Sequence, residues 1–380
     1  MKVLKYPYPY KAWLTISNDP DNTDIAVWKE LDDYLFNELN LDWANSVFLF
    51  NFNQNLPEQV SVKSHPEISD QSIDTLHTWG DFVHAGEKGF TRNDAKEGLA
   101  LLEKKGINPL VWVDHSRFTG NLIHENTWGG IPEHVDSSGN TYKVFEYSLD
   151  LIKKAGIRYA WNGNVTNVIG QDRIVKLNQL LKPYKAPIKA TLLLNKAVGM
   201  SVEEYLDTDN NAYKRKRFKD GNELYCFKRF GEWKNADIDG LSETLSRSNI
   251  DELIKNQGVM IAYTHLGKRN ASSPPRDHHI PESTKARLKD IVKKQKAGVL
   301  NFSSVSKLLD YLILRDHIKL SGNSVDFQSD GLRFSNLKRS DLKGQSFSFK
   351  GTSKPFILLD GQSCSDYELI ETNEIITVRF

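Results

Sequence analysis

Two carboxylates in the segment Ser17–Asp21 stand where they could act on a metal ion. Asp19 and Asp21 lie two residues apart, directly after an apolar run that is typical of a strand. One carboxylate of such a pair can coordinate a cation while the other remains free as a base. The alternative is an Asp-Pro turn that caps the next helix, because Asp and Asn are common turn and N-cap residues.

A second segment, His77-Thr78-Trp79-Gly80-Asp81, places a histidine and a carboxylate four residues apart. On a helical turn this spacing puts both side chains on one side, so His77 and Asp81 could reach the same ion. Imidazole and carboxylate together form an ordinary ligand set for zinc or another divalent transition metal. We therefore predict His77 and Asp81 as metal ligands, although a single histidine is more often structural.

His265 follows the apolar run Gly258–Thr264, which is typical of a buried strand. A histidine at the end of a strand can protonate a leaving group, because its pKa lies near neutrality. The alternative is a partly buried imidazole that is hydrogen-bonded to the backbone.

Further polar and aromatic side chains could contact a substrate. Asp114 and His115 are adjacent at the end of a strand-like run, where they would point to opposite faces, so we expect only one of them to line a pocket. Trp79 could stack on a sugar ring, although aromatic residues are more often part of the core.

The elements that must position these residues alternate between strand and helix. The predicted strands are Ala12–Ser17, Ser46–Asn51, Ile73–His77, Pro109–Asp114, Ile157–Trp161, Lys189–Leu194 and Gly258–Thr264. The predicted helices are Ile25–Leu39, Arg92–Lys105, Lys143–Ala155, Leu241–Asn256, Glu282–Lys296 and Ser303–Leu314. Such alternation predicts an α/β fold with a parallel sheet covered by helices. About seven such units favour a distorted (β/α)7-type barrel over an open sheet, and the polar residues named above stand at the strand ends where barrels carry their chemistry.

The character of the chain changes after residue 316. Short strand-like runs then alternate with Gly, Ser and Asp, namely Ser324–Phe327, Leu332–Phe334, Ser346–Phe349, Phe356–Leu359 and Ile375–Phe380. We predict a barrel domain over residues 1–316 and a small all-β appendage over residues 317–380. The appendage could cap the barrel or bind carbohydrate or a second subunit.

The composition excludes several classes of protein. The 380 residues carry a formal net charge of +1, which gives no overall field to attract nucleic acid, and the basic run Lys214–Arg217 is expected to be a solvated loop. The two cysteines are far apart, which argues against a disulfide scaffold. The sequence has no run of roughly 18 apolar residues that could span a membrane and no apolar leader, so we expect a cytoplasmic protein. Motifs of nucleotide-dependent transferases, serine hydrolases and thermolysin-like proteases are absent from the sequence.

In order and spacing, these segments resemble the motifs of polysaccharide deacetylases, the carbohydrate esterase family 4. Thr15–Asp21 is similar to the family's T-F-D-D-G motif, with Asp-x-Asp in place of adjacent aspartates. His77–Asp81 is similar to its H-[ST]-x-x-H motif, and Ile261–His265 to the strand that ends on a catalytic histidine. The resemblance covers roughly residues 12 to 312 and implies the glycoside hydrolase/deacetylase kind of barrel.

The resemblance also implies roles for individual residues. Asp19 would be the base that activates water, Asp21, His77 and Asp81 would hold the metal, and His265 would protonate the departing amine. Arg117 lies near the place of the family's arginine motif and joins Asp114, His115 and Trp79 as a predicted substrate-binding residue. The expected cofactor is a divalent ion, zinc first, with manganese, cobalt or nickel as substitutes. The expected substrate is a carbohydrate that carries an N-acetyl group, as in surface polysaccharide biosynthesis.

Two alternatives remain open at the level of sequence. An alignment without the Asp-x-Asp shift puts Ser17 and Asn18 at the acidic positions, which would favour a non-catalytic glycan-binding protein with a decayed site. Another metal-dependent C–N hydrolase or a glycoside hydrolase on a similar barrel is the second alternative; a glycosidase would need two carboxylates at a defined separation. The sequence is also compatible with a homo-oligomer.

Overall fold

A computed structural model describes most of the chain. The described residues are 2–68, 73–82, 84–85, 88–114, 121–122, 133–135, 141–143, 145–172, 210–231, 235–273, 276–328, 344–348, 355–364, 368–372 and 375–379. The order of strands and helices shows a mixed α/β fold with parallel sheets, as predicted.

The first sheet contains six strands in the order β12-β13-β10-β7-β5-β3. Their bounds are β3 (Asn45–Val47), β5 (Ile73–His77), β7 (Val111–Val113), β10 (Tyr159–Trp161), β12 (Tyr213–Arg217) and β13 (Glu223–Phe227). All neighbours are parallel except β12, which pairs antiparallel with β13 at the edge. The basic run Lys214–Arg217 lies in this edge strand, so its prediction as a loop was wrong.

The second sheet has five parallel strands in the order β11-β14-β15-β2-β16. They are β2 (Ala12–Asn18), β11 (Val165–Thr166), β14 (Arg229–Phe230), β15 (Val259–Thr264) and β16 (Leu300–Phe302). Only Lys228 separates β13 from β14, so the chain passes there directly from the first sheet into the second.

The two sheets also approach each other between β3, the edge strand of the first, and β2, which lies next to the edge strand β16 of the second. Asn18 Nδ2 donates to Asn45 Oδ1 at 3.2 Å, and Ser46 Oγ donates to the Asn18 carbonyl at 2.5 Å. These bonds involve side chains, and the strands of the first and second sheets form two separate ladders instead of one closed ring of backbone hydrogen bonds. The α/β class is therefore confirmed, whereas the closed seven-unit barrel stays a prediction.

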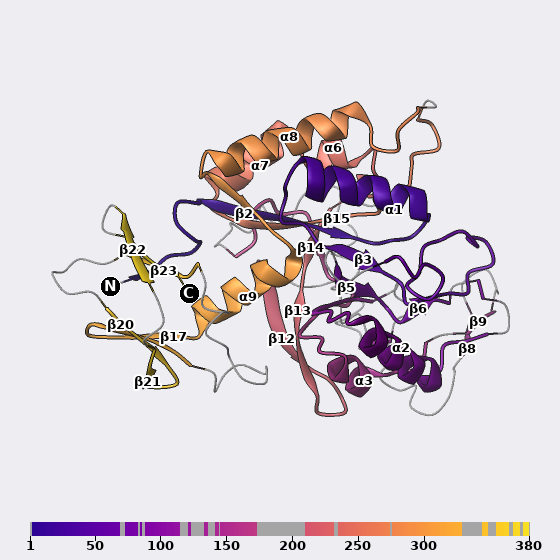
Figure 1. The fold of residues 1–380 in the computed structure, drawn as a ribbon, viewed down its shortest axis with the longest axis horizontal. Coiled ribbons are helices and arrows are strands. Elements are labelled where there is room, and N and C mark those ends of the chain that lie inside the picture. The colour runs from indigo at the N-terminus through magenta and orange to yellow at the C-terminus, as the bar shows by residue number, and fades with distance from the viewer. Residues whose placement is uncertain are drawn as a thin grey trace, which may run out of the picture.

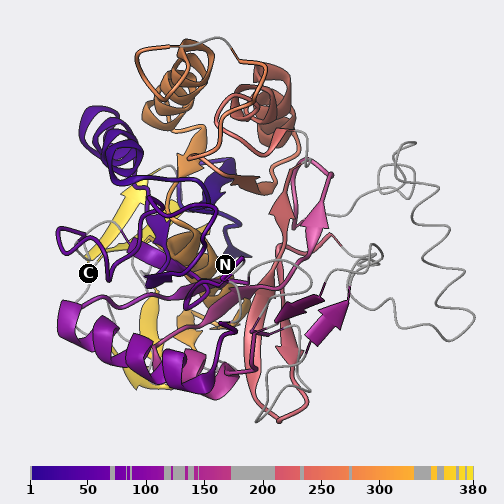
Figure 2. The same cartoon turned by 90° about the vertical axis from the view of Figure 1, so that its right-hand side faces the viewer.

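Helices cover the outer faces of both sheets (Figures 1 and 2). They are α1 (Ile25–Asp32), the π-helix η1 (Asp33–Glu38), α2 (Arg92–Lys105), α3 (Leu149–Lys154), α6 (Leu241–Thr244), α7 (Arg247–Lys255) and α8 (Glu282–Lys296). A further helix, α9 (Val305–Asp316), packs between the two sheets, in one buried cluster with Ile261 of the second sheet and Tyr159 of the first. In Figure 1, α1, α7 and α8 lie beyond β2 and β15, while α2 and α3 lie on the far side of β5 and β13. No helix in the described part of the chain is long and apolar enough to cross a membrane.

Local signals set several of these boundaries. Thr91 and Asp94 form a reciprocal capping box at the start of α2, and Gly106 ends it with a left-handed φ of 68°. The bounds of β5, α2 and α8 agree with the predicted ones. The predicted helix Lys143–Ala155 is wrong over its first part, because residues 141–143 form a strand. The predicted strand Lys189–Leu194 lies outside the described residues.

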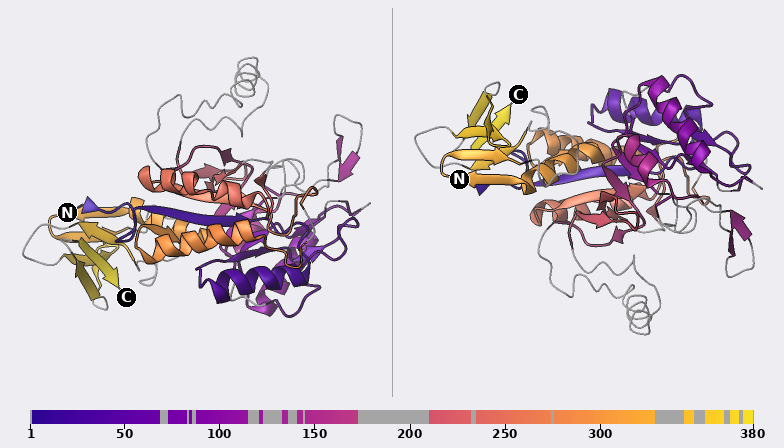
Figure 3. Two further views of the ribbon diagram at one scale, coloured as in Figure 1. Left: turned by 90° about the horizontal axis from the view of Figure 1, so that it is seen from above. Right: turned by 90° about the horizontal axis from the view of Figure 1, so that it is seen from below.

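The C-terminal strands form two four-stranded sheets beside the end of α9 (Figures 1 and 3). One contains β17 (Ile318–Ser321), β18 (Ser324–Phe327), β20 (Phe356–Leu359) and β21 (Gln362–Ser363). The other contains β1 (Lys2–Val3), β19 (Ser346–Ser348), β22 (Glu368–Thr372) and β23 (Ile375–Arg379). Because β1 pairs with β19, the N-terminal strand belongs to this layer, and a division of the chain at residue 316 would cut across that sheet.

Two short strand pairs lie outside these sheets, and one of them matters for the site. They are β4 (Phe50–Asn51) with β6 (Gly80–Asp81), and β8 (Glu133–Val135) with β9 (Thr141–Lys143). The predicted strand Ser46–Asn51 is thus divided between β3 and β4.

Candidate metal centre

The carboxyl ends of β2, β5 and β15 bring four of the predicted residues together, namely Asp19, Asp21, His77 and His265. β2 and β15 are parallel, with Asn18 opposite Thr264, so the residues that follow these two strands emerge at the same edge. Asp19 continues the ladder, since its backbone N–H donates to the Thr264 carbonyl at 2.9 Å. Asp19 and His265 are therefore fixed side by side by the strands that precede them.

Two imidazoles face the same carboxylate oxygen. Asp21 Oδ2 lies 3.4 Å from His77 Nε2 and 3.4 Å from His265 Nε2. Asp19 Oδ2 lies 3.9 Å from each of the same two nitrogens. The Asp19 and His77 side chains are buried, whereas that of Asp21 is 13% exposed, so Asp21 is the most accessible member of the cluster.

Asp19, Asp21 and His77 fit a metal ion by their donor chemistry and spacing. One donor atom of each residue lies within 4.8 Å of the other two, so this buried group could hold a cation. Two ligands about 2.0–2.1 Å from a tetrahedral zinc ion are about 3.3–3.4 Å apart, which is close to the His77–Asp21 distance of 3.4 Å. His77 Nδ1 bonds the Val113 carbonyl at 3.0 Å, an arrangement that presents Nε2 to the carboxylates, as in metal-binding histidines.

Arg229 holds Asp19 by two hydrogen bonds. Its Nη1 donates to Asp19 Oδ1 at 2.5 Å and its Nη2 to Asp19 Oδ2 at 3.1 Å, and the guanidinium is fully buried. Burial by itself would raise the pKa of Asp19, but the Arg229 guanidinium, with His77 and His265, outweighs burial and lowers that pKa. Asp19 is therefore a carboxylate with a fixed orientation.

Two aromatic rings enclose the Arg229 guanidinium. Its Cζ lies 3.5 Å from the centre of the Trp161 ring and 4.1 Å from that of Tyr263, and the two rings are nearly parallel. A cation against aromatic faces is stabilised by the ring quadrupoles. Arg229 was not among the predicted site residues. The available signal was the pair Lys228-Arg229 inside the otherwise apolar stretch Leu224–Phe230, which was not predicted to form strands.

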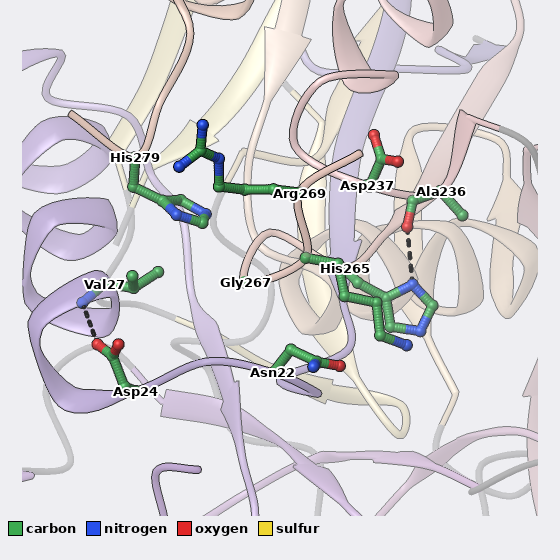
Figure 4. A pocket seen from close by; sticks show the side chains of 10 residues that line it. Asn22, Asp24, Val27, Ala236, Asp237, His265, Gly267, Arg269 and His279 are labelled. Carbon is green, nitrogen blue, oxygen red and sulfur yellow. Dashed lines mark hydrogen bonds between the residues drawn. The ribbon is translucent and has the colours of Figure 1, made fainter. Parts of the chain in front are cut away.

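His265 is oriented by the backbone and by a phenol. Its Nδ1 contacts the Ala236 carbonyl at 2.8 Å (Figure 4). Its Nε2 lies 3.3 Å from the Tyr263 hydroxyl. Burial lowers the pKa of His265, although Asp19 and Asp21 act in the opposite direction. The contact with the backbone that was given as the alternative is present, whereas the role of His265 as a proton donor stays a prediction.

A cavity of about 630 Å³ opens beside His265. In Figure 4, Asp24 and Val27 lie across the pocket from His265. The lining is mostly polar, and His77 is not part of it; the lining residues are Asn22, Asp24, Val27, Ala236, Asp237, His265, Gly267, Lys268, Arg269 and His279. His265 is thus the member of the cluster that also faces the cavity.

The structure does not support Asp81 as a member of the ligand group. His77 ends β5 and Asp81 lies in β6, so the helical turn assumed from their spacing does not exist. The Asp81 carboxylate is buried, and its Oδ2 accepts hydrogen bonds from Gln59 Nε2 at 2.7 Å and Asn53 Nδ2 at 2.8 Å. Among the described residues, the group with metal-binding spacing consists of Asp19, Asp21 and His77 and does not include Asp81.

Two predicted substrate contacts are also corrected. Asp114 is fully buried and accepts hydrogen bonds from the backbone N–H groups of Asn121 and Leu122, so its carboxylate is engaged by the protein backbone. Trp79 is fully buried and packs edge-on against Trp112, which makes it a core residue. The other two predicted contacts, His115 and Arg117, lie outside the described residues.

A scan against protein-family models, a search of curated proteins and a search of solved structures each found no match to the chain.

Proposed function

We propose that this chain is a metal-dependent hydrolase that removes an acyl group, N-acetyl, from a sugar or a polysaccharide precursor. The observation that carries the proposal is the convergence of two imidazole nitrogens on Asp21, each at 3.4 Å, beside a carboxylate that a buried guanidinium holds in place. Such a combination of nitrogen and oxygen donors with a second oriented carboxylate suits metal-assisted hydrolysis.

Asp21 and His77 would hold the ion, which we propose to be zinc, with manganese, cobalt or nickel as substitutes. When bound, a divalent cation polarises an acyl oxygen and lowers the pKa of a water molecule toward neutrality. Asp19 would accept the proton of the attacking water. Its low pKa keeps it ionised, and the two hydrogen bonds from Arg229 keep it aimed at the cluster.

His265 would donate a proton to the departing amine. Three features support this role: it lies at the same distances from both carboxylates as His77, it contacts the Tyr263 hydroxyl, and it lines the cavity where a substrate could enter. A lowered pKa makes the imidazolium a stronger acid once it has been protonated.

The carbohydrate would bind in the cavity beside His265, whose polar lining offers hydrogen-bond partners for sugar hydroxyls. We further propose that the two sheets are parts of one distorted (β/α)7-type barrel and that residues 317–380 form the core of a separate C-terminal layer. The expected substrate is a precursor made in the cytoplasm.

Acetate release from N-acetylglucosamine and its oligomers tests this function. The zinc-loaded protein should release acetate, and Asp19→Asn and His265→Ala should keep the metal while turnover falls about 10²–10⁴-fold, the usual contribution of a general base or acid. His77→Ala should lose both metal and turnover. Full activity of Asp19→Asn would refute the assignment of the base, and metal binding without acetate release from any of these sugars would refute the deacetylase reaction.

A further inference from the structure

Asp81 contacts a glutamine that reaches the loop carrying Asp21. Gln59 Nε2 donates to Asp81 Oδ2 at 2.7 Å, and Gln59 Oε1 accepts from the Asn22 backbone N–H at 2.8 Å. Asn22 directly follows the proposed metal ligand Asp21 and has a left-handed φ of 60°. One side chain thus connects the buried Asp81 carboxylate to the backbone next to that ligand.

The carboxylate determines which way the Gln59 amide points. A carboxylate oxygen accepts hydrogen bonds, so only the NH₂ end of Gln59 can face Asp81 favourably. The carbonyl end must then face Asn22, whose N–H needs an acceptor. Gln59 and Asp81 are both at most 3% exposed, so water cannot substitute freely for the contact between them.

The same loop is confined on other sides. Val60 N–H donates to the Thr23 carbonyl at 2.7 Å, one residue beyond the Gln59 contact. On the side of His265, a Cβ atom on Gly267 would lie 2.8 Å from the Thr23 backbone. The segment that contains Gly267 is therefore packed too closely against Thr23 to admit a side chain. The position of Asp21 therefore depends on segments that the Gln59 amide holds at a defined distance.

From these contacts we infer that Asp81 is a positioning residue for the metal centre, which acts through the Gln59 amide and the Asn22 backbone to hold Asp21 at its coordinating distance. The inference rests on the proposed metal-dependent function and assigns Asp81 a role different from the ligand role that its spacing from His77 indicated. Hydrogen-bond partners behind metal ligands commonly change metal affinity 10- to 100-fold when they are replaced.

Exchanging the two polar groups provides a sharp test. In Asp81→Asn the Gln59 amide is no longer forced into one orientation, and in Gln59→Glu two carboxylates face each other. Each single variant should therefore weaken Co²⁺ binding about 10- to 100-fold, as measured in a titration followed by visible absorption.

The double variant Gln59→Glu/Asp81→Asn restores the contact between positions 59 and 81 with the amide and the carboxylate exchanged. The amide introduced at position 81 can donate to the carboxylate introduced at position 59, and that carboxylate can still accept from the Asn22 backbone N–H. Asn53 loses its acceptor in this variant, because Gln59 and Asn53 donate to the same oxygen, Asp81 Oδ2, in the wild type. The Co²⁺ affinity of the double variant should therefore return to within about threefold of the wild-type affinity. Most of the 10- to 100-fold loss expected in each single variant would then be recovered.

Asn53→Ala is the matched control, since Asn53 also donates to Asp81 but makes no contact with Asn22 among the hydrogen bonds described. It should lower the unfolding free energy in urea and leave Co²⁺ affinity nearly unchanged. Wild-type affinity in both single variants, no recovery in the double variant, or an equal loss in Asn53→Ala would overturn the inference. A wild-type protein that binds no Co²⁺ would instead overturn the proposed metal centre, and the inference with it.

Discussion

The two sides of the metal centre hold buried carboxylates by different means. On the Arg229 side, Asp19 is bonded by a guanidinium that lies between the Trp161 and Tyr263 rings. On the Gln59 side, Asp81 is bonded by the neutral amides of Gln59 and Asn53. Asp19 lies within 4 Å of two imidazoles, whereas Asp81 is connected to the site through Gln59 and the Asn22 backbone.

The difference follows from what each carboxylate has to do. A charged partner lowers the pKa of Asp19 and keeps it ionised close to other titrating groups, at the cost of burying a guanidinium. An amide partner satisfies and orients a carboxylate without adding a charge beside the metal. We therefore interpret the Arg229 side as electrostatic and the Gln59 side as geometric, and the following variants test that distinction.

Arg229→Met should give the largest effect on stability. It leaves the Asp19 carboxylate buried without its cation, a change that costs about 3–5 kcal/mol of unfolding free energy. Urea denaturation at pH 7 measures the loss, and Arg229→Lys should lose less because it retains the charge without the two-pronged geometry. A loss below about 1 kcal/mol for Arg229→Met, well under the cost of an unpaired buried charge, would show that the pair is not an electrostatic requirement.

Asp81→Asn should lower the unfolding free energy less, by about 1–3 kcal/mol. A neutral amide replaces a carboxylate there, and the hydrogen-bond donors Gln59 and Asn53 are themselves neutral. The same urea experiment measures it. If Asp81→Asn destabilised the protein as much as Arg229→Met, the distinction between the two sides would not hold.

Trp161→Leu should have a smaller effect on the unfolding free energy. Loss of one aromatic face from the Arg229 guanidinium should cost about 0.5–2 kcal/mol in addition to any change in packing. Tyr263→Phe is the control, because it keeps a ring beside the guanidinium and removes only the hydroxyl near His265. Thermal unfolding of both variants measures the difference, and an equal destabilisation would argue against a specific contribution from the cation–π contact.

Asp239→Asn should have the smallest effect on the unfolding free energy among these variants. Asp239 pairs with Arg276 beside the cavity at 2.5 Å, and both side chains are partly accessible to solvent. Burial opposes the shift, but hydrogen bonds from Arg276 and Asn270 lower the Asp239 pKa. A lowered folded-state pKa contributes stability above the unfolded value of about 3.9, and this contribution is lost as the pH falls through the folded pKa.

The measurement for Asp239 is urea denaturation between about pH 2 and pH 7, a range that spans the ordinary pKa of an aspartate. At pH 7 the unfolding free energy of the wild type should exceed that of Asp239→Asn by about 1 kcal/mol or less, as is usual for ion pairs near the surface. The unfolding free energies of the two proteins should converge below about pH 4. A gap that widens toward low pH would contradict the assigned sign of the shift.

The sequence predicted the site best where each strand is followed directly by a functional residue. Asp21, His77 and His265 were found because a polar residue at the end of an apolar run is a local signal, and parallel strands bring such ends to one edge. Asp81 was misassigned because its spacing from His77 was interpreted as a helical turn, whereas the chain there enters the short strand β6.

Arg229 was missed for a different reason. Its contact with Asp19 joins positions 210 residues apart, and nothing local specifies such a pairing. A cation inside an apolar strand indicates a buried partner, but the sequence does not say which carboxylate that is. In the C-terminal layer, the strands Ser324–Phe327 and Phe356–Leu359 were predicted with the observed bounds, whereas the pairing of β1 with β19 is a long-range contact without a sequence signal.

Elemental analysis of protein purified without chelator tests the central claim most directly. The account predicts about one divalent ion per chain in the wild type, as in a mononuclear zinc site, and a loss of that ion in His77→Ala. Asp114→Asn, which changes a buried carboxylate outside the cluster, should retain the ion. Absence of metal from the wild type, even after incubation with zinc, manganese or cobalt, would contradict the metal centre and the hydrolase proposed from it.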